Sequence, residues 1–169
     1  EKDLKVFKGN LKKQGYISEV KSVLSEFAQY GVDFERLDDF MKEVPPESYL
    51  HYKLDDIRTI YEKFEEYLSE KYITKEEMLD VLSDAVPYSD ILKGSVVAMD
   101  GFTGFTPVQN RLIGELFSVC EKVMITVTMD GRENPYVYEH PYQIFALGKQ
   151  MVTSLMKIAG EKKTEIEEP

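Results

Sequence analysis

The first half of the chain carries apolar residues at helical spacing in four segments. Gly31 ends the first segment and suits a left-handed C-terminal cap, and Asp33 is a good N-cap for the second. Residues 45–46, both proline, interrupt the pattern, and Thr74 with Glu77 forms a capping box for the fourth. The positions expected to face the core are Val20, Val23, Leu24, Phe27, Ala28, Phe34, Leu37, Phe40, Met41, Leu50, Leu54, Ile57, Tyr61, Phe64, Leu68, Met78, Leu82 and Ala85.

The pattern changes after Gly94. The short apolar run 96–99 predicts a strand buried on both faces, and the β-branched run 123–129 predicts a second strand. Between them Pro107 starts a helix, with Thr106 as its N-cap. Strand, helix and strand within about 35 residues form a βαβ unit, so we expect the two strands to be parallel.

A last helix is expected from about residue 142 to 159, ended by Gly160. Two strands do not make a parallel sheet that buries both faces, so we expect sequence outside this chain to supply neighbouring strands. The fold class is therefore α/β. We expect a helical domain at residues 1–93 and part of a parallel-sheet α/β core at 94–169. The chain opens without an initiator methionine, which suggests a piece of a longer protein.

The formal net charge of −10 argues against broad, nonspecific binding of nucleic acid. The excess of negative charge lies between Asp33 and Asp90, a segment with 17 acidic and 7 basic residues. The opening segment is instead basic, and any contact with DNA is expected from Lys8, Lys12 and Lys13.

Cysteine content and hydropathy indicate the cellular compartment in which the protein acts. The single Cys120 excludes an internal disulfide and a multi-cysteine metal site, and is compatible with a reducing cytosol. No apolar run approaches the roughly 20 residues of a membrane span, and the first residues contain no signal-peptide core. We expect a cytoplasmic protein with no membrane contact.

The first predicted strand ends in Asp100 and Gly101. In P-loop NTPases such a strand ends in Asp-Glu: the aspartate holds Mg²⁺, and the glutamate positions or deprotonates the attacking water. Gly101 has no side chain for the second role, and the chain contains no G-x-x-x-x-G-K-[ST] loop to cradle phosphates. We therefore expect no catalytic residue and no metal site, only a degenerate Walker B remnant.

The block DGFTGFTPVQ at residues 100–109 resembles the D-E-F-Q-D-T-N-P-L-Q block of UvrD-like superfamily I helicases. Asp100, Phe102, Pro107 and Gln109 match in register, whereas the catalytic glutamate and the following Gln and Asp are absent. The second strand runs into Asp130 without the glutamine of those helicases' γ-phosphate sensor. This degenerate pattern is similar to one family in particular, the B subunit (AddB or RexB) of the bacterial ATP-dependent helicase–nuclease.

The resemblance implies a helicase fold without catalytic competence, with residues 1–93 as a 1B-like helical insertion and 94–169 as part of the 1A-like core. In that family the fold lines the DNA path and serves to recognise the recombination hotspot Chi, in double-strand break repair by homologous recombination. The family works with a second helicase–nuclease chain of the AddA or RexA type. It uses Mg²⁺ and an iron–sulfur cluster in a C-terminal nuclease region, so this chain is expected to hold no cofactor. The P-loop would lie upstream of Glu1.

Other interpretations stay open. Asp-Gly is a common turn pair, so the chain could be a helical protein-interaction module with a small α/β cap and no nucleic-acid role. A phosphoacceptor receiver domain would need an acidic pair at an earlier strand end, and the sequence predicts no earlier strand. The aromatic segment 136–142 could stack on bases or pack on its own domain. The incomplete sheet predicts an exposed apolar patch, or a dimer of the isolated chain.

Overall fold

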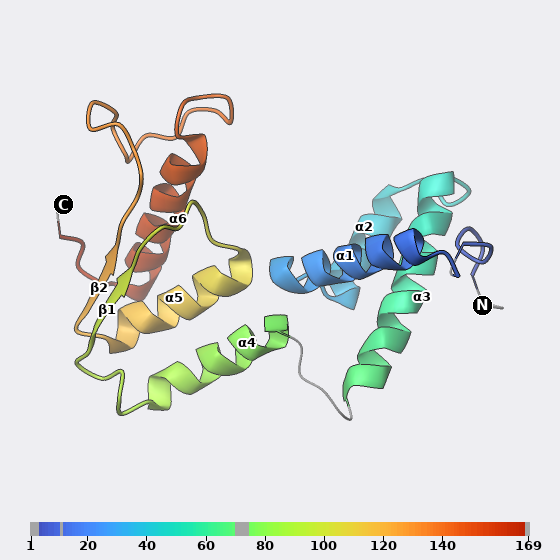
Figure 1. Cartoon of the computed structure of the whole chain (residues 1–169), viewed down its shortest axis with the longest axis horizontal. Helices are drawn as coiled ribbons and strands as arrows, with labels where there is room; N and C mark the ends of the chain where they lie inside the picture. The colour runs from blue at the N-terminus through green and yellow to red at the C-terminus, as the bar shows by residue number, and fades with distance from the viewer. Residues whose placement is uncertain (1–3, 11, 70–74, 168–169) are drawn as a thin grey trace. The chain divides into compact units, whose positions relative to one another are not determined.

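The computed structural model describes residues 4–10, 12–69 and 75–167 (Figure 1). The chain forms two compact units, Glu1–Met78 and Leu79–Pro169. The first unit is helical, and the second combines helices with a two-stranded sheet. The fold is therefore mixed α/β, as the sequence predicts. The assignment of residues 1–93 and 94–169 to helicase subdomains stays a prediction, and the compact units divide at a different point.

Three helices build the first unit: α1 (Gln14–Tyr30), α2 (Phe34–Glu43) and α3 (Tyr49–Ser69). Both predicted caps are confirmed. Gly31 ends α1 in the left-handed conformation, at φ 62°, and the Asp33 carboxylate accepts a hydrogen bond from the backbone N–H of Arg36 at 2.9 Å. The core of this unit consists of Leu37, Val44 and Leu54, with Phe27, Val32 and Met41 packed against it.

Not all of the predicted core positions are buried. Phe40, Leu50 and Phe64 are exposed, so their predicted inward orientation is wrong. In α3 the stripe is buried at Leu54, Tyr61 and Leu68, so the covered face of the helix is narrower than the predicted one. In the fourth helix, α4 (Lys75–Ala85), all three predicted core positions, Met78, Leu82 and Ala85, are also exposed. The predicted capping box of α4 involves Thr74, which lies outside the described residues.

The second unit contains the predicted βαβ element: β1 (Val96–Met99), α5 (Pro107–Val119) and β2 (Lys122–Ile125). The strands are parallel, in a register that runs from Val96 opposite Lys122 to Met99 opposite Ile125. The short η1 (Val86–Tyr88) packs on α5. Within this unit Arg111 of α5 also donates hydrogen bonds to two α4 carboxylates, Asp80 at 2.6 Å and Asp84 at 2.5 Å.

Helices cover one face of this sheet. Ile113 of α5 forms a core with Met151 and Leu155 of α6 (Ala146–Lys162), and Met99, Phe105, Phe117, Ile125 and Val127 pack against that core (Figure 1). The opposite face carries Val96 and Met124, which are 57% and 44% exposed. The expectation that β1 is buried on both faces is thus wrong for this chain, because the described residues place no second layer over the outer face. The predicted apolar patch is present.

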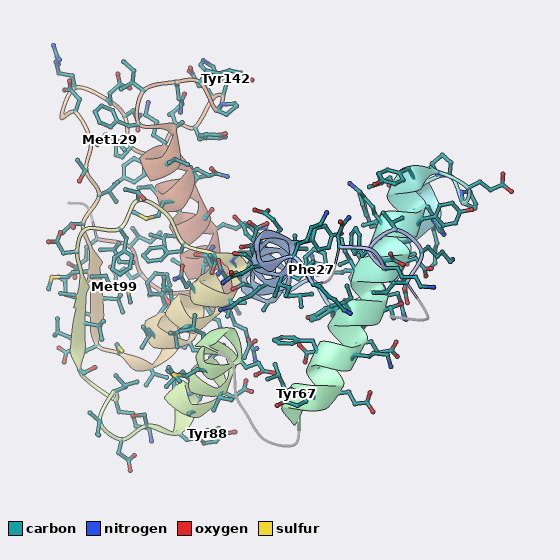
Figure 2. The ribbon with its side chains drawn as sticks, turned by 45° about the vertical axis from the view of Figure 1, so that its right-hand side comes forward. Phe27, Tyr67, Tyr88, Met99, Met129 and Tyr142 are labelled. Carbon is teal, nitrogen blue, oxygen red and sulfur yellow. The ribbon has the colours of Figure 1, made fainter. Side chains whose placement is uncertain are left out.

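Two element boundaries differ from the prediction. β2 ends at Ile125 rather than at Met129. The last helix begins at Ala146, and the chain before it is an open loop in which Tyr142 stands out into solvent (Figure 2). Gly160 lies inside α6 rather than at its end. Lys163 takes the left-handed cap position instead. Its backbone N–H donates to the carbonyl of Gly160 at 3.2 Å, and the backbone N–H of Thr164 donates to the carbonyl of Ala159 at 2.9 Å.

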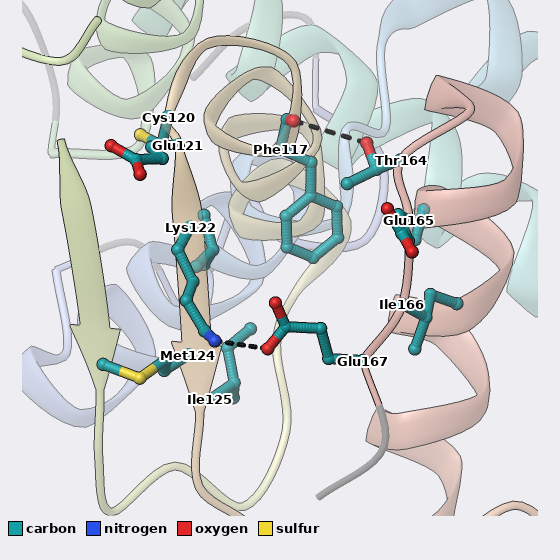
Figure 3. Close-up of a pocket in the computed structure, with 12 residues that line it drawn as sticks. Phe117, Cys120, Glu121, Lys122, Met124, Ile125, Thr164, Glu165, Ile166 and Glu167 are labelled. Carbon is teal, nitrogen blue, oxygen red and sulfur yellow. Dashed lines mark hydrogen bonds and ion pairs between the residues drawn. The ribbon is translucent and has the colours of Figure 1, made fainter. Parts of the chain in front are cut away.

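The C-terminal segment 164–167 runs beside the edge of β2 that does not pair with β1 (Figure 3). The Thr164 hydroxyl donates to the carbonyl of Phe117 at 3.3 Å, and Lys122 pairs with Glu167. Between this segment and β2 lies a cavity of about 570 Å³. Among the described residues, no strand other than β1 pairs with β2.

Candidate functional site

Asp100 follows β1 directly and is tied to the end of β2. The backbone N–H of Thr126 donates to the carbonyl of Met99 at 3.0 Å, and the Thr126 hydroxyl donates to Oδ1 of Asp100. These contacts extend the parallel ladder by one residue beyond each strand. One carboxylate oxygen of Asp100 therefore serves to join the two strand ends.

Gly101 lies where an active NTPase strand would carry its glutamate. Its φ is +80°, a conformation that residues with a side chain rarely adopt. A Cβ added there would meet no atom within 4 Å, so the obstacle to a side chain is the backbone conformation and not crowding. The turn that follows β1 thus favours glycine at this position.

The two phenylalanines of the block contact each other. The ring centroids of Phe102 and Phe105 lie 5.0 Å apart, with the rings tilted by 35°. Phe105 packs against the core around Ile113, whereas Phe102 is exposed. Phe102 therefore covers the outer side of an aromatic pair at the corner between β1 and α5.

The remaining matched residues build the start of α5. Thr106 is the N-cap and Pro107 occupies the first turn, as predicted. The backbone N–H of Thr106 donates to Gln109 Oε1 at 2.9 Å, and the backbone N–H of Gln109 donates to the Thr106 hydroxyl at 3.4 Å. This reciprocal pair is a capping box, which satisfies two N–H groups that a helix start leaves free. Gln109 is thus engaged in helix capping.

The expectation that this strand end holds no magnesium ion stays a prediction. Mg²⁺ in NTPases is held by carboxylate, phosphate and water oxygens in octahedral geometry. Asp100 uses one of its oxygens for Thr126, and nowhere in the described part of the chain do three His, Cys, Asp or Glu side chains come together as a metal site.

Asp130, which follows the second predicted strand, is engaged locally. Arg132 donates to both of its oxygens, from Nε at 3.0 Å and from Nη2 at 2.7 Å. The Arg132 side chain, and after it the Arg132 backbone N–H, hold the pKa of Asp130 below its usual value. Asp130 and its partner thus form a self-contained turn.

The three candidate DNA-contacting lysines lie in the other unit. Lys8, Lys12 and Lys13 precede or flank the start of α1, and all three are exposed. None of them forms an ion pair with the residues that the structure describes. They belong to the first unit, whereas Asp100 belongs to the second.

Three residues of structural importance escape the sequence patterns. Thr126 binds Asp100, the buried Asp56 binds the N-terminal loop, and the buried ammonium of Lys149 pairs with Glu133 at 2.7 Å. When a single carboxylate or lysine lies within a helical pattern, the sequence does not indicate which residue it binds. Thr126 could have been found from the strand register, had the parallel alignment been known to one residue.

Comparison with known proteins identifies the family. The family model described as "ADDB, N-terminal" matches residues 1–169. The chain belongs to the AddB N-terminal family. The B subunit of the ATP-dependent helicase/deoxyribonuclease of Lachnoclostridium phytofermentans is 40% identical to it over 168 residues, which are 99% of this chain. Proteins of the same name from Thermoanaerobacter sp. and Clostridium acetobutylicum are 33% and 30% identical, over 100% and 99% of this chain.

The chain spans 14% of the length of each of these AddB relatives. The resemblance based on the block at residues 100–109 is thereby confirmed at the level of the family. In the part of this AddB-type chain that the structure describes, no helix is both long and apolar enough to cross a membrane.

Proposed function

We propose that this chain is a non-catalytic, helicase-like part of the AddB-type component of an ATP-dependent helicase–nuclease, acting in the repair of DNA double-strand breaks by homologous recombination. The observation that carries the proposal is the family match over residues 1–169, with relatives named as the B subunit of an ATP-dependent helicase/deoxyribonuclease. The nuclease and helicase activities named for those relatives belong to proteins about seven times longer, since this chain spans 14% of their length.

The strand end supports the non-catalytic part of the proposal. Gly101 supplies no base, and its positive φ disfavours any residue that could supply one. Asp100 is bonded to Thr126. Such enzymes require a group that orients the attacking water, and position 101 offers none.

The same residues support a scaffold role. Each matched position of the block has a structural partner: Asp100 joins the strands, Phe102 stacks on Phe105, and Gln109 caps the helix that Pro107 starts. The block is retained because it shapes the corner between β1 and α5. In the whole protein this corner would belong to a 1A-like core that lines the DNA path and contributes to the recognition of Chi.

The incomplete sheet supports placement within a larger core. The outer face of the sheet exposes Val96 and Met124, and the outer edge of β2 borders a cavity. We infer that the 1A-like core continues outside this chain, with residues 1–93 as its 1B-like insertion. The partner would be a helicase–nuclease chain of the AddA or RexA type, in the cytoplasm. Mg²⁺ and the iron–sulfur cluster would belong to the distant nuclease region.

Photo-cross-linking in the whole complex tests this proposal. The AddA-type and AddB-type proteins would be assembled on a DNA end whose strands carry 5-bromodeoxyuridine, irradiated during translocation, and digested for peptide mapping. We expect cross-linked peptides from the segment corresponding to residues 1–169. Cross-links confined to the AddA-type protein and to the remainder of the AddB-type protein would contradict the DNA-path role and favour a helical protein-interaction module.

A further inference from the structure

A small pocket opens within the first unit, between the N-terminal loop, α1 and α3. Its volume is about 240 Å³, below the roughly 300–1,000 Å³ of pockets for drug-sized ligands, and it suits a single planar ring system. Its lining is mostly apolar and aromatic, with few polar groups. The lining residues that matter below are Phe7, Asn10, Tyr16, Tyr49 and Lys53.

The loop that forms one wall of this pocket is anchored by a buried carboxylate. Asp56 of α3 is 1% exposed and accepts hydrogen bonds from three successive backbone N–H groups, those of Lys5 at 2.7 Å, Val6 at 2.7 Å and Phe7 at 2.8 Å. The ring of Phe7 is buried and meets Tyr16 edge-to-face, with centroids 5.2 Å apart. The wall is therefore formed before any ligand arrives.

The polar groups of the pocket are placed at its rim. The Asn10 side chain forms no hydrogen bond with the described residues, so its amide is available to a ligand. Burial raises the pKa of Tyr16, and nearby Tyr49 and Asp56 raise it further, so its hydroxyl remains protonated and can donate. Lys53 Nζ lies 4.8 Å from the centroid of the Tyr49 ring. Flat aromatic faces with amide and hydroxyl groups beside them match the face and edge of a nucleobase.

The charge around the pocket fits a polyanion, although the whole chain is acidic. Residues 4–18 contain four lysines and no aspartate or glutamate, and the one carboxylate that lines the pocket is that of Glu19. Lys5 pairs with Asp55 at 2.8 Å, whereas Lys8, Lys12 and Lys13 have no acidic partner among the described residues. Lys53 adds a further ammonium at the pocket rim. A backbone of phosphates next to the pocket would meet these ammonium groups, and its base would meet the tyrosines.

We propose that this pocket holds one unstacked base of single-stranded DNA, with the adjoining phosphates on Lys8, Lys12 and Lys13. A paired base in a duplex cannot enter, because its edge and faces are occupied, so the site selects single strands. This inference rests on the proposed function, since it gives the DNA-path role a specific contact surface in the first unit.

Fluorescence anisotropy of a labelled 15-nucleotide oligothymidylate, at low salt with the 169-residue chain, tests the proposal. Tyr49→Ala should weaken binding at least about fivefold, the loss expected for one base–aromatic contact. Tyr67→Ala is the matched control, because Tyr67 lies near the other end of α3 (Figure 2) and both tyrosines are 65% exposed. It should leave the affinity unchanged within about twofold.

Two further binding measurements distinguish the contribution of the base from that of the phosphates. Lys12→Ala should weaken binding and reduce its salt dependence, whereas Lys42→Ala, which removes an equal charge from α2, should not. An abasic oligonucleotide of the same length should bind the wild-type chain as weakly as oligothymidylate binds Tyr49→Ala.

Equal binding of the Tyr49→Ala and Tyr67→Ala chains, together with undiminished binding of the abasic strand, would overturn the base pocket and leave a phosphate-only contact in place. No binding of any strand by the wild-type chain would also overturn it. In either case the cross-linking in the whole complex decides separately whether the DNA-path role stands.

Discussion

The Thr126 hydroxyl donates a hydrogen bond to the carboxylate of Asp100 and thereby joins the ends of two parallel strands. In an active NTPase the corresponding carboxylate would face magnesium and phosphate. Here its partner is the neutral hydroxyl of the residue that follows β2, opposite Asp100 in the parallel register. This relationship gives Asp100 a structural role at the strand ends.

A double-mutant cycle measures this contact. Asp100→Ala and Thr126→Val should each lower the free energy of unfolding, and the coupling between them should be about 0.5–1 kcal/mol, modest because both side chains are exposed. Urea unfolding followed by circular dichroism provides the four values. Additive losses, with no coupling, would show that the hydrogen bond does not form in solution.

Gly101 and Gly104 form a matched pair within the same turn. Gly101→Ala should destabilise the chain by about 1–2 kcal/mol, because its φ of +80° is unfavourable for any residue with a Cβ. Gly104 has no such φ and no atom within 4 Å of an added Cβ, so Gly104→Ala should be close to neutral. Gly101→Glu should also destabilise and should not create activity. Equal melting temperatures for the two alanine variants would refute the positive-φ argument.

Local signals in the sequence account for the parts of the fold that were predicted correctly. Gly31, Asp33 and the Thr106–Pro107 start of α5 were identified because a helix end is determined within three or four residues. The end of α6 was predicted wrongly for a related reason. Gly160 carries the usual stop signal, yet the helix continues to Lys162.

Asp56 provides a prediction for the first unit. Asp56→Asn removes the charge and one acceptor oxygen from three N–H donors, and should cost about 2–4 kcal/mol because buried donors are left unsatisfied. The amides of Lys5, Val6 and Phe7 should then exchange with deuterium much faster. Asp55→Asn is the control: it breaks only an exposed ion pair with Lys5, and its effect should be small. Unchanged protection of the three amides in Asp56→Asn would contradict the anchoring role.

The contacts of Asp56 and Thr126 also show which features could not be predicted from the sequence. Asp56 lies 49 to 51 residues from its partners, and Thr126 lies 26 residues from Asp100. Periodicity and capping rules describe neighbours along the chain, so they contain no information on such pairs. The burial of the strands was overestimated for a similar reason. The apolar run at 96–99 is compatible with two covered faces, and this chain supplies cover for only one.

The exposed apolar residues of the sheet face should favour association of the chain with a second copy. We predict that the isolated chain self-associates through Val96 and Met124, because exposed apolar groups gain by burial against a second copy. Val96→Glu should shift the sedimentation coefficient toward that of the monomer. Val81→Glu, at a position with 54% exposure against 57% for Val96, should not. A wild-type chain that is monomeric throughout the micromolar range would contradict this prediction.

The most direct test of the central claim is ATP turnover by the whole helicase–nuclease assembled with a full-length AddB-type protein that carries Asp100→Ala. Turnover would be measured per assembled complex, with saturating DNA ends and Mg²⁺, beside a Thr126→Val complex as the control for loss of the same hydrogen bond. We predict that both complexes hydrolyse ATP within about twofold of the wild-type rate, because the proposed function assigns this strand end neither metal nor nucleotide. A loss of tenfold or more in Asp100→Ala, with Thr126→Val unaffected, would show that Asp100 acts in catalysis and would contradict the account.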